Sequence, residues 1–286
     1  MKVLITGAQG QLGRELALRK PEEVAFLLKS KKALDLTDST ALERLLVEEH
    51  ITTVINCAAY TAVDAAEIHK EKAFAINGKA VKTLGALCKK HSIRLIHIST
   101  DYVFDGEACQ PYQTDAACNP VNAYGASKRE GEEALLTLEV PDCAIIRTSW
   151  LYSFFGENFV KTMLRLGQEK EQLNVVDDQV GSPTYAGDLA DFILKYALGF
   201  RSTTTRILHY TNEGVCSWYD FAIEIMRLAG LSCAVRPIPA SAYPTQAKRP
   251  SYSVLDTHAL KKEFGVPIPY WRSSLETCIK QLKPTS

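Results

Sequence analysis

The sequence has no net charge, no long apolar run and no paired cysteine motif. Its 286 residues carry 33 Lys and Arg against 33 Asp and Glu, which argues against broad binding to nucleic acids or anionic membranes. No stretch approaches the roughly 18 apolar residues of a membrane span, and the N-terminal apolar run ends too early for a signal peptide. Eight cysteines are scattered without a Cys-x-x-Cys or a paired metal-ligand spacing. We therefore expect free thiols, no metal site and a cytoplasmic protein.

Short apolar runs alternate with amphipathic stretches in the first half of the chain. The runs at residues 3–6 and 95–99 are apolar without alternation, which is typical of strands buried on both faces of a parallel sheet. Stretches between such runs, for example residues 11–19, have apolar residues at helical spacing. This order predicts an α/β fold with a doubly wound, parallel, Rossmann-type sheet, whose ligand lies at the carboxyl ends of the strands.

The pattern loosens near residue 150, which predicts two lobes. We expect residues 1–150 to form a dinucleotide-binding domain and residues 151–286 to form mainly a smaller, C-terminal substrate-binding lobe. Two later strands, near residues 173–177 and 205–211, are predicted to return to the first sheet.

A glycine-rich turn follows the first predicted strand. Gly7, Gly10 and Gly13 are spaced Gly-x-x-Gly-x-x-Gly, which differs from the Gly-x-Gly-x-x-Gly of the dinucleotide fingerprint. Glycines at these positions still permit a tight turn, a close approach of the backbone to a diphosphate, and a helix N-terminus directed at its negative charge. Because the turn lies between a strand and a helix, it favours a dinucleotide site over a purely structural turn.

The end of the second predicted strand bears on the choice of dinucleotide. NAD-selective enzymes usually place Asp or Glu there for the ribose 2′-hydroxyl, whereas Lys29 suits a 2′-phosphate. The sequence therefore favours NADPH, with NADH as the alternative cofactor and a solvated lysine-rich turn as the alternative role of Lys29. Asp35 and Leu36, which we place at the end of the next short strand, are expected to meet the adenine. Ala58 and Ala59, after the fourth predicted strand, leave room for the cofactor backbone.

Tyr124 and Lys128 are four residues apart, so on a helix they share one face. A cation beside a phenol favours the phenolate and lowers the tyrosine pKa from about 10. Such a phenol can stabilise the charge that hydride transfer builds on a ketone oxygen and then donate its proton. Thr100 follows the strand at residues 95–99 and is the third candidate catalytic residue, unless it only caps the turn. Together with the glycine turn, these residues predict a nicotinamide-dependent carbonyl reductase.

The motifs resemble the extended short-chain dehydrogenase/reductase family. The segments that carry this resemblance are residues 7–13, 99–104 and 124–128. Later segments are similar to one branch of the family, the reductases of dTDP-linked 4-keto sugars, and these are residues 147–152, 158–163 and 178–184. The resemblance covers nearly the whole chain. It implies the last step of dTDP-L-rhamnose synthesis, in which NADPH or NADH reduces the C4 ketone of dTDP-4-dehydro-L-rhamnose.

The resemblance also implies roles for site residues. It makes Tyr124 the proton donor, while Lys128 lowers the tyrosine pKa and bonds the nicotinamide ribose. Thr100 and Asp101 lie in the substrate site, where Thr100 also tunes Tyr124, and Trp150 lines the sugar pocket. Further positions that match cofactor contacts are Gly10, Gln11, Leu12, Asp35, Leu36, Ala58, Ala59 and Tyr60.

Two features concern the diphosphate and the oligomeric state. Arg249 resembles part of the family's diphosphate-binding region, and a guanidinium suits phosphate, although plain surface charge is the alternative. Some family members form metal-bridged dimers through glutamates. Glu15 is present here, but Gly187 occupies the second acidic position and Asp188 is offset by one. We therefore expect a monomer or homodimer without a bridging metal.

Two other functions are compatible with parts of the pattern. A nucleotide-sugar epimerase or dehydratase of the same superfamily shares the Tyr and Lys but retains the reducing equivalent within its catalytic cycle. A non-catalytic, cofactor-binding regulatory subunit of this fold is the second alternative. The presence of both Tyr124 and Lys128 argues against the regulatory subunit.

Overall fold

The predicted apolar runs form a six-stranded parallel sheet. In the computed structural model, which describes residues 1–282, the strand order is β10-β5-β4-β3-β1-β2. The strands of the sheet are β1 (Lys2–Thr6), β2 (Ala25–Lys29), β3 (Thr53–Asn56), β4 (Arg94–Thr100), β5 (Cys143–Thr148) and β10 (Arg206–His209). Every neighbouring pair is parallel. The predicted α/β fold with a doubly wound parallel sheet is confirmed.

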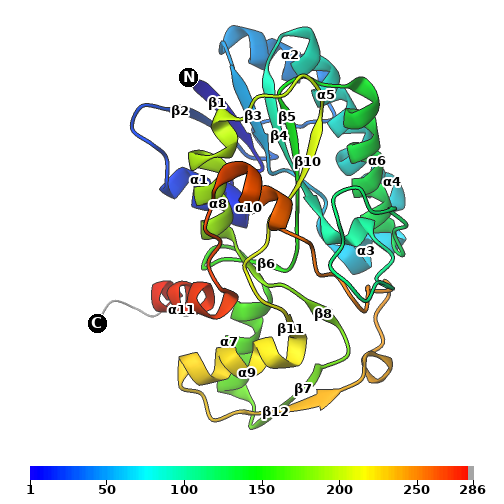
Figure 1. The fold of residues 1–286 in the computed structure, drawn as a ribbon, viewed down its shortest axis with the longest axis vertical. Coiled ribbons are helices and arrows are strands. Elements are labelled where there is room, and N and C mark those ends of the chain that lie inside the picture. The colour runs from blue at the N-terminus through cyan, green and yellow to red at the C-terminus, as the bar shows by residue number, and fades with distance from the viewer. Residues whose placement is uncertain (283–286) are drawn as a thin grey trace.

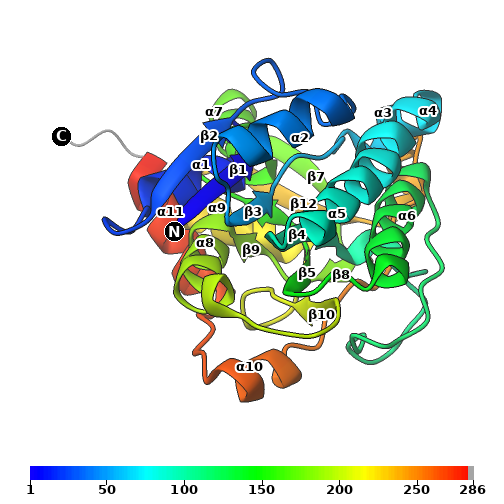
Figure 2. The same cartoon turned by 90° about the horizontal axis from the view of Figure 1, so that it is seen from above.

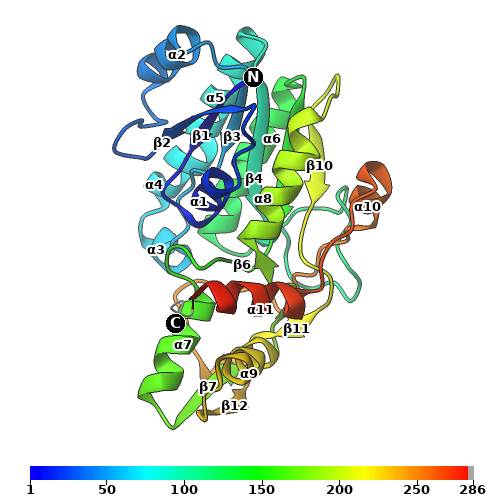
Figure 3. The same cartoon turned by 90° about the vertical axis from the view of Figure 1, so that its left-hand side faces the viewer.

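Helices cover both faces of this sheet (Figures 2 and 3). They are α1 (Gln11–Leu18), α8 (Ala186–Lys195), α2 (Ser39–Glu48), α5 (Ala80–Lys90) and α6 (Ala123–Leu138). Leu16 of α1 and Leu189 of α8 pack on one face. Leu42 of α2, Leu84 of α5 and Leu135 of α6 pack on the other. The inner strands β1, β3, β4 and β5 are consequently buried from both sides, as their unbroken apolar runs require, whereas the edge strand β2 is half-buried or exposed along its length.

A second, smaller lobe lies beyond the carboxyl ends of the strands (Figure 1). Its helices are α7 (Phe159–Glu169), α9 (Trp218–Ala229) and α11 (Trp271–Leu282). Its short strands pair two by two, as β6 (Leu151–Tyr152) with β9 (Thr184–Tyr185), β8 (Val180–Gly181) with β11 (Cys216–Ser217), and β7 (Gln172–Val176) with β12 (Ala234–Ile238). Phe221, Ile225 and Trp271 are among the buried residues of its core.

The chain crosses between the lobes several times after residue 150. Helix α8 and strand β10 belong to the sheet lobe, so the strand predicted near residues 205–211 does return to the sheet. Leu260 of α10 (His258–Phe264) and Ile268 also pack in that lobe. Among residues 1–282, no helix has both the length and the apolar character needed to cross a membrane.

The strand predicted near residues 173–177 does not return to the main sheet. It is β7, and it pairs in parallel only with β12. Its side chains alternate, with Leu173 and Val175 buried while Gln172 and Asn174 are exposed. Alternation of this kind suits a strand with one solvent face, whereas the main sheet buries both faces. The prediction was wrong because it considered strand propensity without this alternation.

The short strand predicted to end at Asp35 and Leu36 is also absent. The chain turns there, and Asp35 Oδ1 accepts hydrogen bonds from the backbone N–H (3.0 Å) and the hydroxyl (2.8 Å) of Thr37. A carboxylate that bonds the backbone two residues ahead favours a turn over a strand. Ala58 therefore follows the third strand of the chain, β3, and not a fourth.

Candidate active site

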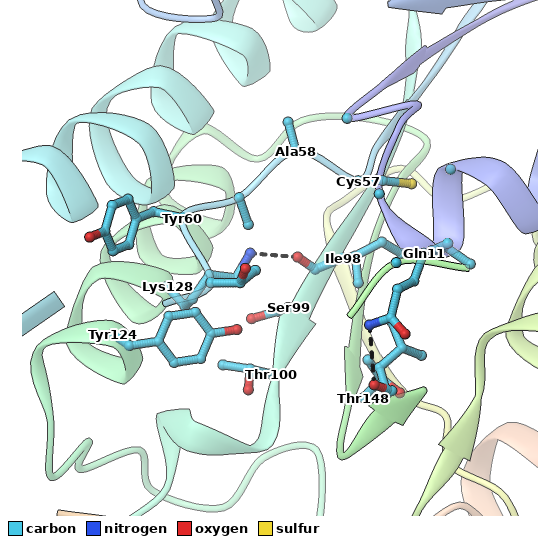
Figure 4. Close-up of a pocket in the computed structure, with 18 of the residues that line it drawn as sticks. Gln11, Cys57, Ala58, Tyr60, Ile98, Ser99, Thr100, Tyr124, Lys128 and Thr148 are labelled. Carbon is cyan, nitrogen blue, oxygen red and sulfur yellow. Dashed lines mark hydrogen bonds between the residues drawn. The ribbon is translucent and has the colours of Figure 1, made fainter. Parts of the chain in front are cut away.

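A cavity of about 830 Å³ lies at the carboxyl ends of the sheet strands, against the second lobe (Figure 4). The sequence-predicted residues that line it are Gly7, Gly10, Gln11, Leu12, Gly13, Asp35, Leu36, Ala58, Ala59, Tyr60, Thr100, Asp101, Tyr124, Lys128 and Trp150. Lys29 and Arg249 are not among the lining residues. The structure therefore brings together nearly all of the predicted site in one continuous space.

The glycine turn forms one end of the cavity by packing backbone against backbone. Gly7 has φ of +63°, and a Cβ there would lie 2.7 Å from the backbone nitrogen of Ala58. A Cβ on Gly13 would lie 2.6 Å from the carbonyl oxygen of Gly7. Gly10 is the N-cap residue of α1 and has no side chain, so no side-chain cap competes for the N–H groups of the first helical turn. Together, the close approach and the helix N-terminus fit a dinucleotide diphosphate.

The loop after β2 borders the same end of the cavity. Ser30 and Lys31 line it, whereas Lys29 contributes its carbonyl oxygen to a hydrogen bond from the Ala8 N–H (3.2 Å). Hydrogen bonds from Thr37 lower the pKa of Asp35, which keeps that carboxylate ionised. The positive side chain that borders the cavity here is thus Lys31, two residues beyond the predicted position.

Helix α6 places Tyr124 and Lys128 on the cavity wall. The helix begins at Ala123, because the side chain of Asn122 accepts the Gly125 N–H (2.8 Å) as an N-cap. Tyr124 is consequently in the first turn and Lys128 one turn further. Figure 4 shows both side chains beside the end of β4, with the tyrosine hydroxyl directed towards Ser99 and Thr100.

The electrostatics of the pair differ from the sequence-based expectation. Burial raises the pKa of Tyr124 to about 12, and its hydrogen bond with Thr100 opposes this effect. Burial lowers the pKa of Lys128 to about 8, and the Glu132 carboxylate acts in the opposite direction. The lysine Nζ donates to the carbonyl oxygen of Ile98 (2.6 Å). The predicted lowering of the tyrosine pKa is therefore absent, because burial favours the neutral phenol and the Asp101 carboxylate acts in the same direction, so the phenol keeps its proton at neutral pH.

Asp101 lies next to this centre with an unused acceptor. Its Oδ1 accepts the Thr100 hydroxyl (3.0 Å), and its Oδ2 has no hydrogen-bond partner among the described residues. The side chain is buried, and burial raises its pKa to about 7, although the nearby Ser253 and Thr100 hydroxyls act in the opposite direction. A buried polar atom without a partner at a cavity wall is suited to a ligand hydroxyl.

The sequence reasoning missed Asn77. This residue is buried in a π-helical turn, Ala75–Lys79, between α4 (Lys70–Phe74) and α5. Its amide accepts from the Tyr60 N–H (2.8 Å), and its Nδ2 donates to the Tyr60 carbonyl oxygen and the Ser127 hydroxyl, each at 3.0 Å. It therefore holds the loop after β3 against α6. A lone Asn inside an apolar helical stretch was the available signal.

An aromatic wall closes the other end of the cavity. Of its members, Trp150, Phe159, Trp218 and Phe221, the sequence indicated only Trp150. Trp150 has φ of +47°, a left-handed conformation that is rare for a large side chain. Its ring lies parallel to that of Trp218, with the ring centroids 3.5 Å apart and the planes 7° apart.

Three charged residues singled out from the sequence are engaged elsewhere. The guanidinium of Arg249 forks onto the carboxylate of Asp64, on α3 (Val63–Ile68), at 2.6 and 3.1 Å. Glu15 is fully buried and pairs with Arg19. Asp188 accepts from the side chains of Asn212 and Ser274. Within residues 1–282, no group of three or more His, Cys, Asp or Glu residues is placed to hold a metal ion.

The Rossmann-type sheet, the glycine turn and the Tyr124–Lys128 helix define the class of short-chain dehydrogenases/reductases. Within this class, a family model described as the RmlD substrate binding domain matches residues 1–283. The chain belongs to this family.

The chain is similar to known proteins over nearly its whole length. It is 41% identical to a dTDP-4-dehydrorhamnose reductase of Burkholderia thailandensis, with 99% of each chain covered. The crystal structure of a dTDP-4-dehydrorhamnose reductase of Clostridium acetobutylicum matches with a TM-score of 0.94 and 43% identity, covering 99% of each chain. That of the Bacillus anthracis enzyme in complex with NADP matches with a TM-score of 0.93 and 38% identity, covering 98% of this chain and 99% of that one.

Proposed function

We propose that this protein is an oxidoreductase that reduces the C4 ketone of dTDP-4-dehydro-L-rhamnose with NADPH and forms dTDP-L-rhamnose, the last step of dTDP-rhamnose biosynthesis. One observation carries the proposal: Tyr124, Lys128 and Thr100 meet in the same cavity as the glycine turn. The relatives named dTDP-4-dehydrorhamnose reductase support the substrate, and the related structure bound to NADP supports the cofactor.

The residues of the cavity can perform the proton half of this reduction. Bound NADPH supplies a hydride to C4, and the carbonyl oxygen then needs one proton to become the hydroxyl of the product. The Tyr124 hydroxyl is protonated at neutral pH because its pKa is about 12, so it can donate that proton as charge develops on the oxygen. We propose that Thr100 orients the phenol, whose hydroxyl is directed towards it (Figure 4).

Lys128 can stabilise the negative charge that forms on the tyrosine oxygen when the proton leaves. Its ammonium lies on the same helix face, and its pKa of about 8 lets it remain charged at neutral pH while a proton can still leave it. We propose that Lys128 also bonds the nicotinamide ribose and thereby exchanges its present acceptor, the Ile98 carbonyl oxygen, for a ribose hydroxyl.

The two ends of the cavity would hold the two ligands. We assign the cofactor to the glycine turn, with Asp35 and Leu36 at the adenine and the basic turn after β2 at the 2′-phosphate, where Lys31 is better placed than Lys29. The sugar belongs at the other end, between Asp101 and Trp150.

Arg249 takes a different role in this proposal from direct diphosphate binding. It is paired with Asp64, and the Ala247 N–H donates to the same carboxylate (3.0 Å). The loop that carries Arg249 is therefore tied to α3 of the sheet lobe. We propose that Arg249 positions this loop over the nucleotide.

A turnover assay with each nicotinamide tests the function. The loss of NADPH absorbance on addition of dTDP-4-dehydro-L-rhamnose should equal the dTDP-L-rhamnose formed, measured by chromatography. An epimerase or dehydratase would convert sugar without net loss of NADPH, and a regulatory subunit would convert none. Either result would overturn the proposal.

We also propose a cytoplasmic location and a monomeric or homodimeric state without a bridging metal. All eight cysteines are free thiols, which suits a reducing compartment. Light scattering with and without EDTA tests the second point, since a metal-bridged dimer would dissociate when the metal is removed.

A further inference from the structure

Trp150 adopts its left-handed conformation in a short turn that is held by hydrogen bonds. The turn joins β5 to β6, and the Trp150 carbonyl oxygen accepts the Thr184 N–H (3.2 Å). The neighbouring Ser149 hydroxyl donates to the carbonyl oxygen of Ser182 (2.7 Å). A conformation that is costly for a large residue persists only where the surroundings impose it, and such positions cluster at functional sites.

Gly181 provides the space for the Trp150 indole. A Cβ on Gly181 would lie 2.6 Å from Cε2 and 2.8 Å from Nε1 of that ring. Any side chain at this position would therefore displace the indole. Gly181 is in β8 and pairs with Cys216 of β11, and Trp218 follows β11 directly in the chain.

Trp218 is placed beside Trp150 by the start of helix α9. Ser217 caps the helix and forms a reciprocal capping box with Asp220, which fixes Trp218 as the first helical residue. Its ring stacks on that of Trp150, and Phe159 packs near it with the ring centroids 4.7 Å apart. The stack thus connects the end of a sheet-lobe strand to the first residue of a helix in the second lobe.

We propose that Trp218 is a positioning residue for the reduction: by stacking on Trp150, it fixes where the sugar ring lies relative to the Tyr124 hydroxyl. This inference rests on the proposed function. A shift of about 1 Å in a bound substrate can cost about 100-fold in rate. Trp218 acts through Trp150 and needs no contact with the ketone.

Three variants test the stack. Trp218→Leu removes it, Trp218→Phe retains an aromatic partner, and Gly181→Ala pushes the Trp150 indole while both tryptophans stay in the chain. Tyr219→Leu is the matched control, since Tyr219 is the next residue of α9 and does not line the cavity. Each variant is checked for folding by its thermal midpoint.

The readouts separate positioning from general damage. Stacked indoles couple their electronic transitions, so the wild type should show a tryptophan couplet in circular dichroism that Trp218→Leu lacks. We expect Trp218→Leu and Gly181→Ala to lower kcat/KM for the ketosugar by about 10- to 100-fold, partly through kcat, with NADPH affinity unchanged. Trp218→Phe should restore most of the activity, and Tyr219→Leu should stay close to wild type.

A double-variant cycle decides whether Trp218 acts through Trp150. In the Trp150→Ala background, removal of Trp218 should cost less than twofold, because the partner that it orients is already gone. Full additivity, or a wild-type kcat/KM in Trp218→Leu despite loss of the couplet, would overturn the positioning role alone. If the wild type does not consume NADPH with the ketosugar, the proposed function fails, and the role of Trp218 at that sugar fails with it.

Discussion

The two ends of the cavity are built by different means. At the end that we propose for the cofactor (the cofactor end), backbone atoms of the glycine turn pack against the backbone after β3, as the contact between Gly7 and Ala58 shows. At the end that we propose for the sugar, aromatic side chains from separate segments pack on one another, as Trp150 and Trp218 do. The first end therefore follows from the order of strands and turns, whereas the second depends on how two lobes meet.

The reacting centre lies between these ends, and its loss should have the largest effect. Tyr124→Phe removes the proton donor with little change in volume, so turnover should fall by about 10²–10⁴-fold while NADPH still binds. Steady-state kinetics and fluorescence titration of NADPH measure the two quantities. Tyr112→Phe is the control, because it removes a buried hydroxyl outside the cavity. Near-normal turnover by Tyr124→Phe would remove the residue from its assigned role.

The backbone contacts of the cofactor end should tolerate almost no added volume. Gly13→Ala places a Cβ within 2.6 Å of backbone atoms of Gly7 and Ala8, and overpacking of this kind typically costs about 1–3 kcal/mol. We expect a lower thermal midpoint and NADPH binding weakened by roughly 10- to 100-fold. Gly199→Ala is the matched control, since a Cβ there meets nothing within 4 Å. Equal behaviour of the two variants would show that the turn can relax.

Side-chain charge at the cofactor end should matter less than its backbone. Lys31→Ala should weaken NADPH by roughly tenfold and leave NADH nearly unchanged, because a hydrogen bond to a charged group is worth about 1.5–3 kcal/mol and only NADPH has the phosphate. Titrations of both dinucleotides measure this, with the exposed Lys32→Ala as the control. If only Lys29→Ala weakens NADPH, the sequence-based assignment of the phosphate to Lys29 is right and that to Lys31 is wrong.

The smallest effect that we expect concerns Asp101 and the pH dependence of the stability of the folded chain. Its pKa in the folded chain is about 7, above its ordinary value of 3.8, so the folded chain binds more protons between these values. Its contribution to stability is therefore fully present below pH 4 and is lost as the pH rises through about 7. His97 and His209 act in the opposite direction, because burial lowers the pKa of each.

The difference between wild type and Asp101→Asn isolates this contribution. Replacement of the carboxyl by an amide should raise the thermal midpoint at pH 8, relative to wild type, by a few degrees more than at pH 5. Differential scanning calorimetry across this range measures the shift. A difference between the two proteins that does not change with pH would show that Asp101 titrates normally.

Much of the fold followed from local pattern. The apolar runs of the first half predicted strands of the main sheet, because inner strands buried on both faces leave an unbroken signal. The strand near residues 205–211, which is β10, was also predicted to join this sheet. The errors came where pattern was weaker. β7 was assigned to the wrong sheet, since its alternation over five residues was not weighed, and the turn at Asp35 was taken for a strand.

The site was predictable where a residue's role depends on its neighbours in the sequence. Tyr124 and Lys128 share a helix, and Thr100 ends a strand, so their spacing was enough. Trp218 was missed because its place beside Trp150 depends on two short strand pairs that carry almost no sequence signal. The pKa of Tyr124 was misjudged for a similar reason, because burial is a property of the assembled cavity and not of spacing.

The π-helical turn at Ala75–Lys79 has a consequence for insertions and deletions. Such a turn holds one residue more than the α-helix around it, and each residue of an α-helix rotates the next by about 100°. Deletion of one residue here would restore a regular helix but would rotate Asn77 away from Tyr60 and Ser127, or else turn the apolar face of α5 off the sheet. The additional residue lets Asn77 face the loop at Tyr60 while the apolar residues of α5 face the core. The length of this segment is therefore more tightly constrained than its composition.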